Sequence, residues 1–168
     1  AVYAERLKDP VAAARTWRRV LVLSPGHARA LRVLRESYVA SGDWDGLEEL
    51  YASQNDWEGL VDFLSGAADK ATDPATKLDI SFRAARIFEK QLKAEPDSAA
   101  LHVGLGRSLA KIGRCREALD NLWPYIGTVP FGGEAAFAAV NCSNHLGLRD
   151  DAVFFDHLAV SLDPTSAR

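Results

Sequence analysis

Apolar positions along this chain recur at helical spacing, and no segment shows the two-residue alternation of a β-strand. Leu101, Leu105 and Leu109, for example, recur every four residues and form one stripe along a helix. Leu and Ala are abundant and β-branched residues are scattered, which also favours helices. The pattern therefore predicts an all-α chain.

Capping and turn residues divide the pattern into about ten helices joined by short loops. Asp9-Pro10 and Asp73-Pro74 each place an N-cap before a proline at the first helical position. Gly42 supplies a left-handed residue that ends a helix, and Asn55 with Glu58 has the spacing of a capping box. The helices are predicted over residues 1–8, 10–23, 27–41, 43–53, 56–70, 74–95, 97–112, 114–127, 134–146 and 149–162.

Small and turn-forming residues recur at an interval of 34 residues in the second half of the chain. Gly113 is followed at that interval by Gly147, and Ala118 by Ala152. The same step leads back from Ala118 to Ala84. A fixed period of this length indicates a helical repeat array, in which each helix pair buries its second face against the next pair.

The residues at these positions resemble the tetratricopeptide repeat, with Trp-x2-Leu-Gly-x2-Tyr in its first helix, Ala-x3-Phe in its second, and then Pro. The match is best over residues 99–132 and covers nearly the whole chain as a single domain. Asp156 stands where the family has an aromatic residue. The best repeat matches through Leu105, Gly106, Ala118, Leu122 and Pro130, and the repeats cover 1–27 (partial), 28–53, 54–98 (irregular), 99–132 and 133–166. Because the chain has no Met and begins inside a repeat, we expect a fragment of a longer protein.

The resemblance implies a right-handed α-solenoid of antiparallel helix pairs, whose concave groove binds a peptide or protein segment without catalysis. The family's two-carboxylate clamp has Lys and Asn one turn apart, and here Phe137 precedes Asn141 instead, so that clamp is not reproduced. A solvated polar face is the alternative for the same positions. The groove positions fall on Arg29, Arg32, Glu36, Val103, Arg107, Lys111, Phe137, Asn141, Asn144 and His145, with Ala110 and Glu134 beside them. This set offers cations for carboxylates, amides for peptide backbone, and Val103 and Phe137 as apolar anchors.

Charge is unevenly distributed along the chain. Residues 1–41 have a net charge of +5 and residues 42–80 a net charge of −8, within a total of −3. One alternative function is therefore an RNA-binding helical repeat, although the acidic middle and the lack of a regular base-reading residue disfavour nucleic acid. Another is a substrate-docking or regulatory arm of a larger enzyme, and self-association is also compatible with the opposite charges. In the RNA-binding alternative, the residues that would bind RNA are Arg15, Arg18, Arg19, Arg29, Arg32 and Arg35.

The sequence contains no recognisable catalytic or cofactor motif. It has no Gly-rich phosphate loop, no nucleophile elbow and no His-Glu-x-x-His. Cys115 and Cys142 lack metal-ligand spacing, so we expect reduced thiols, with a disulfide or metal site as the alternative. His102 is expected to pack within a repeat. We expect no enzyme activity, no cofactor, no metal and no membrane insertion, and we favour a cytoplasmic location.

Overall fold

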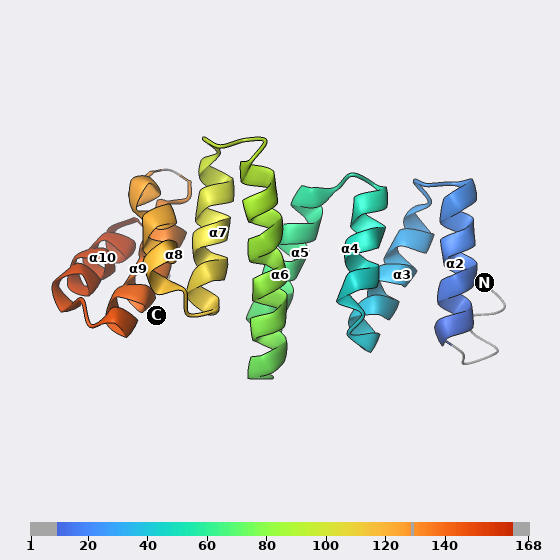
Figure 1. Cartoon of the computed structure of the whole chain (residues 1–168), viewed down its shortest axis with the longest axis horizontal. Helices are drawn as coiled ribbons and strands as arrows, with labels where there is room; N and C mark the ends of the chain where they lie inside the picture. The colour runs from blue at the N-terminus through green and yellow to red at the C-terminus, as the bar shows by residue number, and fades with distance from the viewer. Residues whose placement is uncertain (1–9, 129, 163–168) are drawn as a thin grey trace. The chain divides into compact units, whose positions relative to one another are not determined.

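The computed structural model describes residues 10–128 and 130–162, and over these ranges all regular structure is helical, as Figure 1 shows. The predicted all-α class is confirmed. The chain divides into two compact units, residues 1–60 and 61–168, which we describe separately. The helices are α2 (Pro10–Leu23), α3 (Ala28–Ser41), α4 (Trp44–Ser53), α5 (Trp57–Lys70), α6 (Pro74–Leu92), α7 (Ala99–Lys111), α8 (Cys115–Leu122), α9 (Gly132–Leu146) and α10 (Arg149–Leu162), with a 3₁₀ turn η1 (Trp123–Tyr125).

Most predicted helix boundaries agree with the structure to within a few residues, and one does not. The helix predicted over 114–127 is wrong at its end, because α8 stops at Leu122 and η1 follows. Pro124 causes this break, since proline donates no backbone hydrogen bond and its ring clashes with the preceding helical turn. The start of α9 at Gly132, predicted at about 134, is among the boundaries that agree. The helix predicted over 1–8 and the cap at Asp9 lie outside the described residues.

The phrase Asp-Trp-x-Gly-Leu begins both α4 and α5 and caps them in the same way. The Asp43 carboxylate accepts a hydrogen bond from the Gly46 N–H, and the Asp56 carboxylate accepts one from the Gly59 N–H, each at 2.9 Å. A Cβ at Gly46 would lie 2.7 Å from the Asp43 carboxylate, and one at Gly59 would lie 2.5 Å from that of Asp56. Glycine at this position therefore leaves room for the cap.

The capping box predicted from Asn55 and Glu58 is wrong. Asn55 has a φ of 53°, in the left-handed region, and therefore belongs to the turn before α5. Asp56, the next residue, caps α5 instead. The other predicted capping features, Asp73 before α6 and left-handed Gly42 after α3, are confirmed.

In the first unit, α3 packs against both α2 and α4. Leu34 and Tyr38 on α3 and Leu47 on α4 are buried and form part of the core. Arg18 of α2 donates a hydrogen bond from Nε to the Tyr38 hydroxyl, and its guanidinium carbon lies 5.2 Å from the Tyr38 ring centroid. This cation–π contact joins α2 to the inner face of α3.

In the second unit, α7 packs against α6, α8 and α9, and α9 also packs against α8 and α10. Ala84, Ala118 and Ala152, the small residues predicted to lie between helices, are 1%, 0% and 5% exposed. A Cβ added to Gly106 would lie 2.5 Å from Leu122 Cγ and 3.2 Å from the Ala118 carbonyl oxygen. The small residues Gly106 of α7 and Ala118 of α8 therefore allow these two helices to approach each other closely.

The aromatic residue of the last helix pair lies one position earlier than the repeat alignment predicts. Phe155 is buried, whereas Asp156 is exposed. The Phe155 ring meets Trp123 edge-on, with 5.3 Å between the ring centroids. Phe155 therefore takes the packing role that the alignment assigned to position 156.

His102 packs within a helix pair, as predicted. Its Nδ1 lies 2.8 Å from Asn121 Oδ1 on α8, and its Nε2 lies 2.9 Å from the Pro96 carbonyl oxygen. The imidazole also stacks on Tyr125, with 5.4 Å between ring centroids. Among the described helices, none is both long and apolar enough to span a membrane.

Candidate functional site

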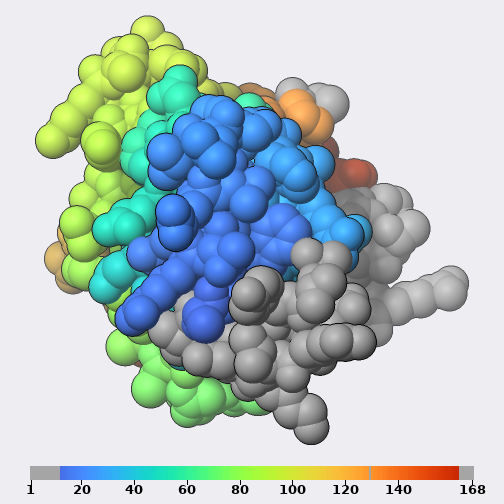
Figure 2. Space-filling model, turned by 90° about the vertical axis from the view of Figure 1, so that its right-hand side faces the viewer, coloured from blue at the N-terminus to red at the C-terminus, as the bar shows by residue number. Residues whose placement is uncertain are grey.

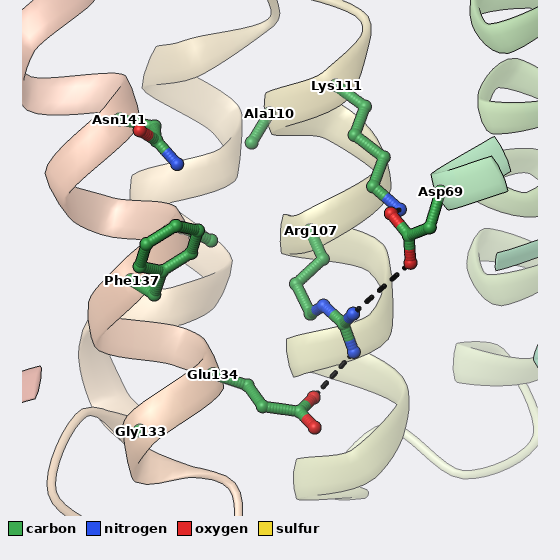
Figure 3. Close-up of a pocket in the computed structure, with 9 residues that line it drawn as sticks. Asp69, Arg107, Ala110, Lys111, Gly133, Glu134, Phe137 and Asn141 are labelled. Atoms are coloured by element: carbon green, nitrogen blue, oxygen red, sulfur yellow. Dashed lines mark hydrogen bonds and ion pairs between the residues drawn. The ribbon is translucent and has the colours of Figure 1, made fainter. Parts of the chain in front are cut away.

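A hollow of about 440 Å³ opens on the second unit, and residues of α5, α7 and α9 line it, as Figure 3 shows. We call it the α7–α9 groove. Three separate helices contribute side chains to it, so its shape depends on tertiary packing rather than on any one segment. The lining residues are Asp69 of α5, Arg107, Ala110 and Lys111 of α7, and Gly133, Glu134, Phe137, Ala138 and Asn141 of α9.

The composition of α9 explains why Phe137 faces the groove. The buried positions of α9 carry only small residues, which allow this helix to pack closely on its neighbours. Phe137 is the only Phe of α9, and its side chain is 59% exposed. The buried positions are Gly132, Ala135, Ala136, Ala138, Ala139, Cys142 and Ser143.

A chain of ion pairs links the three helices that line the groove. Arg107 Nη1 lies 2.5 Å from Glu134 Oε2, and Arg107 Nη2 lies 3.9 Å from Asp69 Oδ2. Lys111 Nζ lies 2.7 Å from Asp69 Oδ1. The two cations and two carboxylates balance, so this chain of ion pairs has no net charge. Such partly exposed pairs add little stability, but they hold the side chains in place.

The α9 side of the groove combines an apolar ring with an amide. In Figure 3, Phe137 and Asn141 stand one turn apart on α9 and face Ala110 of α7 across the groove. Ala138 also lines this part of the groove. The arrangement offers an apolar surface for a ligand side chain beside a group that both donates and accepts hydrogen bonds.

The structure brings together four of the residues predicted for a partner-binding groove: Arg107, Lys111, Phe137 and Asn141. Ala110 and Glu134, predicted beside them, also line it. The prediction that Val103 is an apolar anchor of the groove is wrong. Val103 is 2% exposed and belongs to the core. Its valine side chain falls on the stripe of α7 that packs against other helices.

The remaining predicted residues lie outside the α7–α9 groove. Asn144 and His145 are exposed on α9 but do not line the hollow. Arg29, Arg32 and Glu36 are exposed on α3 of the first unit. The Arg29 guanidinium carbon lies 5.8 Å from the Trp17 ring centroid, a cation–π contact within that unit.

Sequence reasoning missed Asp69, which pairs with both cations of the groove. The 34-residue offset leads from Arg107 back to Asp73 and not to Asp69, because the irregular repeat at 54–98 disrupts the register. No signal in the sequence alone marks Asp69 as a groove residue.

Cys115 of α8 and Cys142 of α9, the two cysteines of the chain, are free thiols and both are buried. Burial, together with a hydrogen bond to the Cys115 thiol, raises the pKa of Cys142 to about 12. A thiol in such surroundings stays protonated and is a poor nucleophile. The expectation of two reduced thiols is confirmed.

We expect Cys142 to give the stability of the chain a pH dependence at alkaline pH. The unfolded thiol loses its proton near its ordinary pKa, whereas the folded thiol keeps it up to about 12. Stability is therefore fully present below the ordinary pKa and falls as the pH rises between these two values. Urea unfolding of the wild type and of Cys142→Ala at successive pH values measures this, and the variant should show the shallower fall. Equal slopes in the two proteins would contradict the assignment.

No group of three or more His, Cys, Asp or Glu side chains within residues 10–128 and 130–162 is placed to hold a metal ion. A scan against protein-family models finds no match to this chain, and a search of curated proteins finds none either. The geometry of the α7–α9 groove is therefore the evidence for the function.

Proposed function

We propose that the chain is a scaffold or adaptor that binds an extended peptide or protein segment in the α7–α9 groove. The proposal includes a tetratricopeptide-like solenoid of helix pairs. The 34-residue period and the packing of α7 against both α8 and α9 support that arrangement.

The observation that carries the proposal is the exposure of Phe137 inside a hollow. A ligand that covers a large apolar side chain that is 59% exposed buries apolar surface, and this burial stabilises the complex. Aromatic residues in concave surroundings are also the residues on which binding energy concentrates. Phe137 would thus be the anchor, contacting an apolar side chain of the bound segment.

The other residues of the groove define which segment fits best. Asn141, one turn along α9, would pair with a backbone amide of an extended peptide. Because Arg107 and Lys111 are neutralised by Glu134 and Asp69, we propose a ligand with an apolar anchor and little net charge. Its affinity should depend only weakly on salt, unlike that of an acidic peptide held by free cations.

A peptide-display selection on the immobilised chain, followed by fluorescence anisotropy with the enriched peptides, tests this proposal. Phe137→Ala should raise Kd by about tenfold or more, because it removes the anchor. Asn141→Ala should raise Kd by about threefold to tenfold, equivalent to one lost hydrogen bond.

The second unit provides matched controls for both substitutions. Phe82 on α6 is 48% exposed and lies outside the groove, so Phe82→Ala should leave Kd unchanged. Asn144→Ala, one turn beyond Asn141 and also outside the groove, should do the same. Enriched peptides that bind all four variants as tightly as the wild type would exclude the groove as the binding site.

A further inference from the structure

The first unit carries opposite charges on two neighbouring segments. Residues 10–41 contain six arginines and one carboxylate, Glu36, whereas residues 42–60 contain six carboxylates and no Lys or Arg. Because α3 packs against both α2 and α4, the basic and acidic segments adjoin within one unit. Such a surface is complementary in charge to a rotated copy of itself.

A second hollow, of about 330 Å³, lies on this unit, and we call it the α2–α4 hollow. Leu21 and Val22 of α2 and Leu50 of α4 give it apolar walls, and Tyr38 of α3 also lines it. Arg18 stands on the α2 side and Glu49 on the α4 side. The hollow therefore combines apolar side chains with one charge of each sign, and Ser53 and Gln54 add polar groups to its lining.

Two apolar side chains project from the surface at the edge of this hollow, and one of them, Val22, also lines it. Val22 is 81% exposed and Leu23 is 87% exposed, the highest values among the large apolar residues that the structure describes. Figure 2 shows the surface of α2, in blue, toward the reader. An apolar projection and an apolar hollow thus occur together on one surface.

We propose that two copies of the chain pair about a two-fold axis through this surface. Leu23 of each copy enters the α2–α4 hollow of the other and contacts the Val22 side chain that lines it. The exposed Arg19 of each copy then faces Glu49 of the other. A two-fold interface requires a self-complementary patch, and both the projection with its hollow and the paired charges meet that requirement. This inference uses the first unit and is independent of the α7–α9 groove.

Single-stranded RNA is an alternative partner for the exposed arginines of the first unit. Two features of the first unit favour a second copy instead. The guanidinium of Arg29 lies over the Trp17 ring, where a base would stack. Glu49 also lines the hollow and would repel a phosphate backbone.

Analytical ultracentrifugation of the 168-residue chain from about 1 to about 100 µM tests the pairing. We expect a concentration-dependent dimer, and we expect Leu23→Asp to raise its Kd by about tenfold or more, because a carboxylate would enter an apolar hollow. Val153→Asp is the matched control: Val153 is 57% exposed on α10 of the second unit and should leave Kd unchanged. Circular dichroism of each variant confirms that it is folded.

A charge exchange gives a second test that does not depend on apolar contacts. Arg19→Glu and Glu49→Arg should each weaken self-pairing, because like charges then face each other across the axis. An equimolar mixture of these two variants should restore the dimer, because both facing pairs become opposite in sign. A wild-type chain that stays monomeric, a dimer insensitive to Leu23→Asp, or a mixture that does not pair would each overturn the proposal. A monomer that binds a single-stranded RNA oligonucleotide at low salt would also overturn it.

Discussion

Leu122→Ala is expected to lower the free energy of unfolding by about 2–5 kcal/mol, the range for emptying a well-packed leucine site. Leu122 is 0% exposed at the end of α8 and fits against Gly106 of α7. The helices on both sides are held by other contacts, so the space left by the side chain cannot close completely. Urea unfolding followed by circular dichroism measures the change.

Leu78 provides the matched control for this substitution. It lies on α6 of the same unit and is 51% exposed, so Leu78→Ala should change the free energy of unfolding by no more than about 0.5 kcal/mol. Similar losses for Leu122→Ala and Leu78→Ala would mean that the contact of α7 with α8 does not stabilise the unit.

Ala118→Leu is expected to destabilise the chain by about 1–3 kcal/mol through overpacking. Ala118 is 0% exposed, and its carbonyl oxygen lies where Gly106 brings α7 close, so added methyl groups would push the helices apart. Ala152→Leu should have a similar effect, because Ala152 is 5% exposed at the equivalent position 34 residues later. Thermal and urea unfolding of both variants measure these effects.

An alanine on the exposed side of α7 shows whether the effect comes from packing. Ala100 is exposed, so Ala100→Leu should leave the free energy of unfolding within about 0.5 kcal/mol of the wild type. Unchanged unfolding of both Ala118→Leu and Ala152→Leu would mean that the repeat phase is wrong.

Much of the fold could be predicted from sequence, because local rules determine it. The burial of Ala118 and Ala152 follows from a fixed interval between small residues, and Gly42 ends α3 because glycine readily adopts a positive φ. The end of α8 was mispredicted because the apolar stripe continues to Ile126, past the proline at position 124. The prediction followed the apolar periodicity, whereas the proline at position 124 ends the helix in the structure.

The candidate site could be predicted only in part, because it depends on which helices become neighbours. Phe137 and Asn141 were found because the family resemblance places both on the groove face of one helix, and they do line the hollow. The neutralisation of Arg107 was not predictable, since it arises from Asp69 on a helix in an irregular repeat. Val103 was assigned to the surface from family position alone, although an apolar residue on that stripe packs inward.

Mapping a selected peptide on the isotope-labelled chain by NMR tests the central claim, that the α7–α9 groove is the binding site. We predict that the amide signals that change on titration cluster on α7 and α9, around Ala110, Phe137 and Asn141. We further predict that Phe137→Ala abolishes these changes at the same peptide concentration. Changes confined to the first unit, or to α10, would contradict the claim.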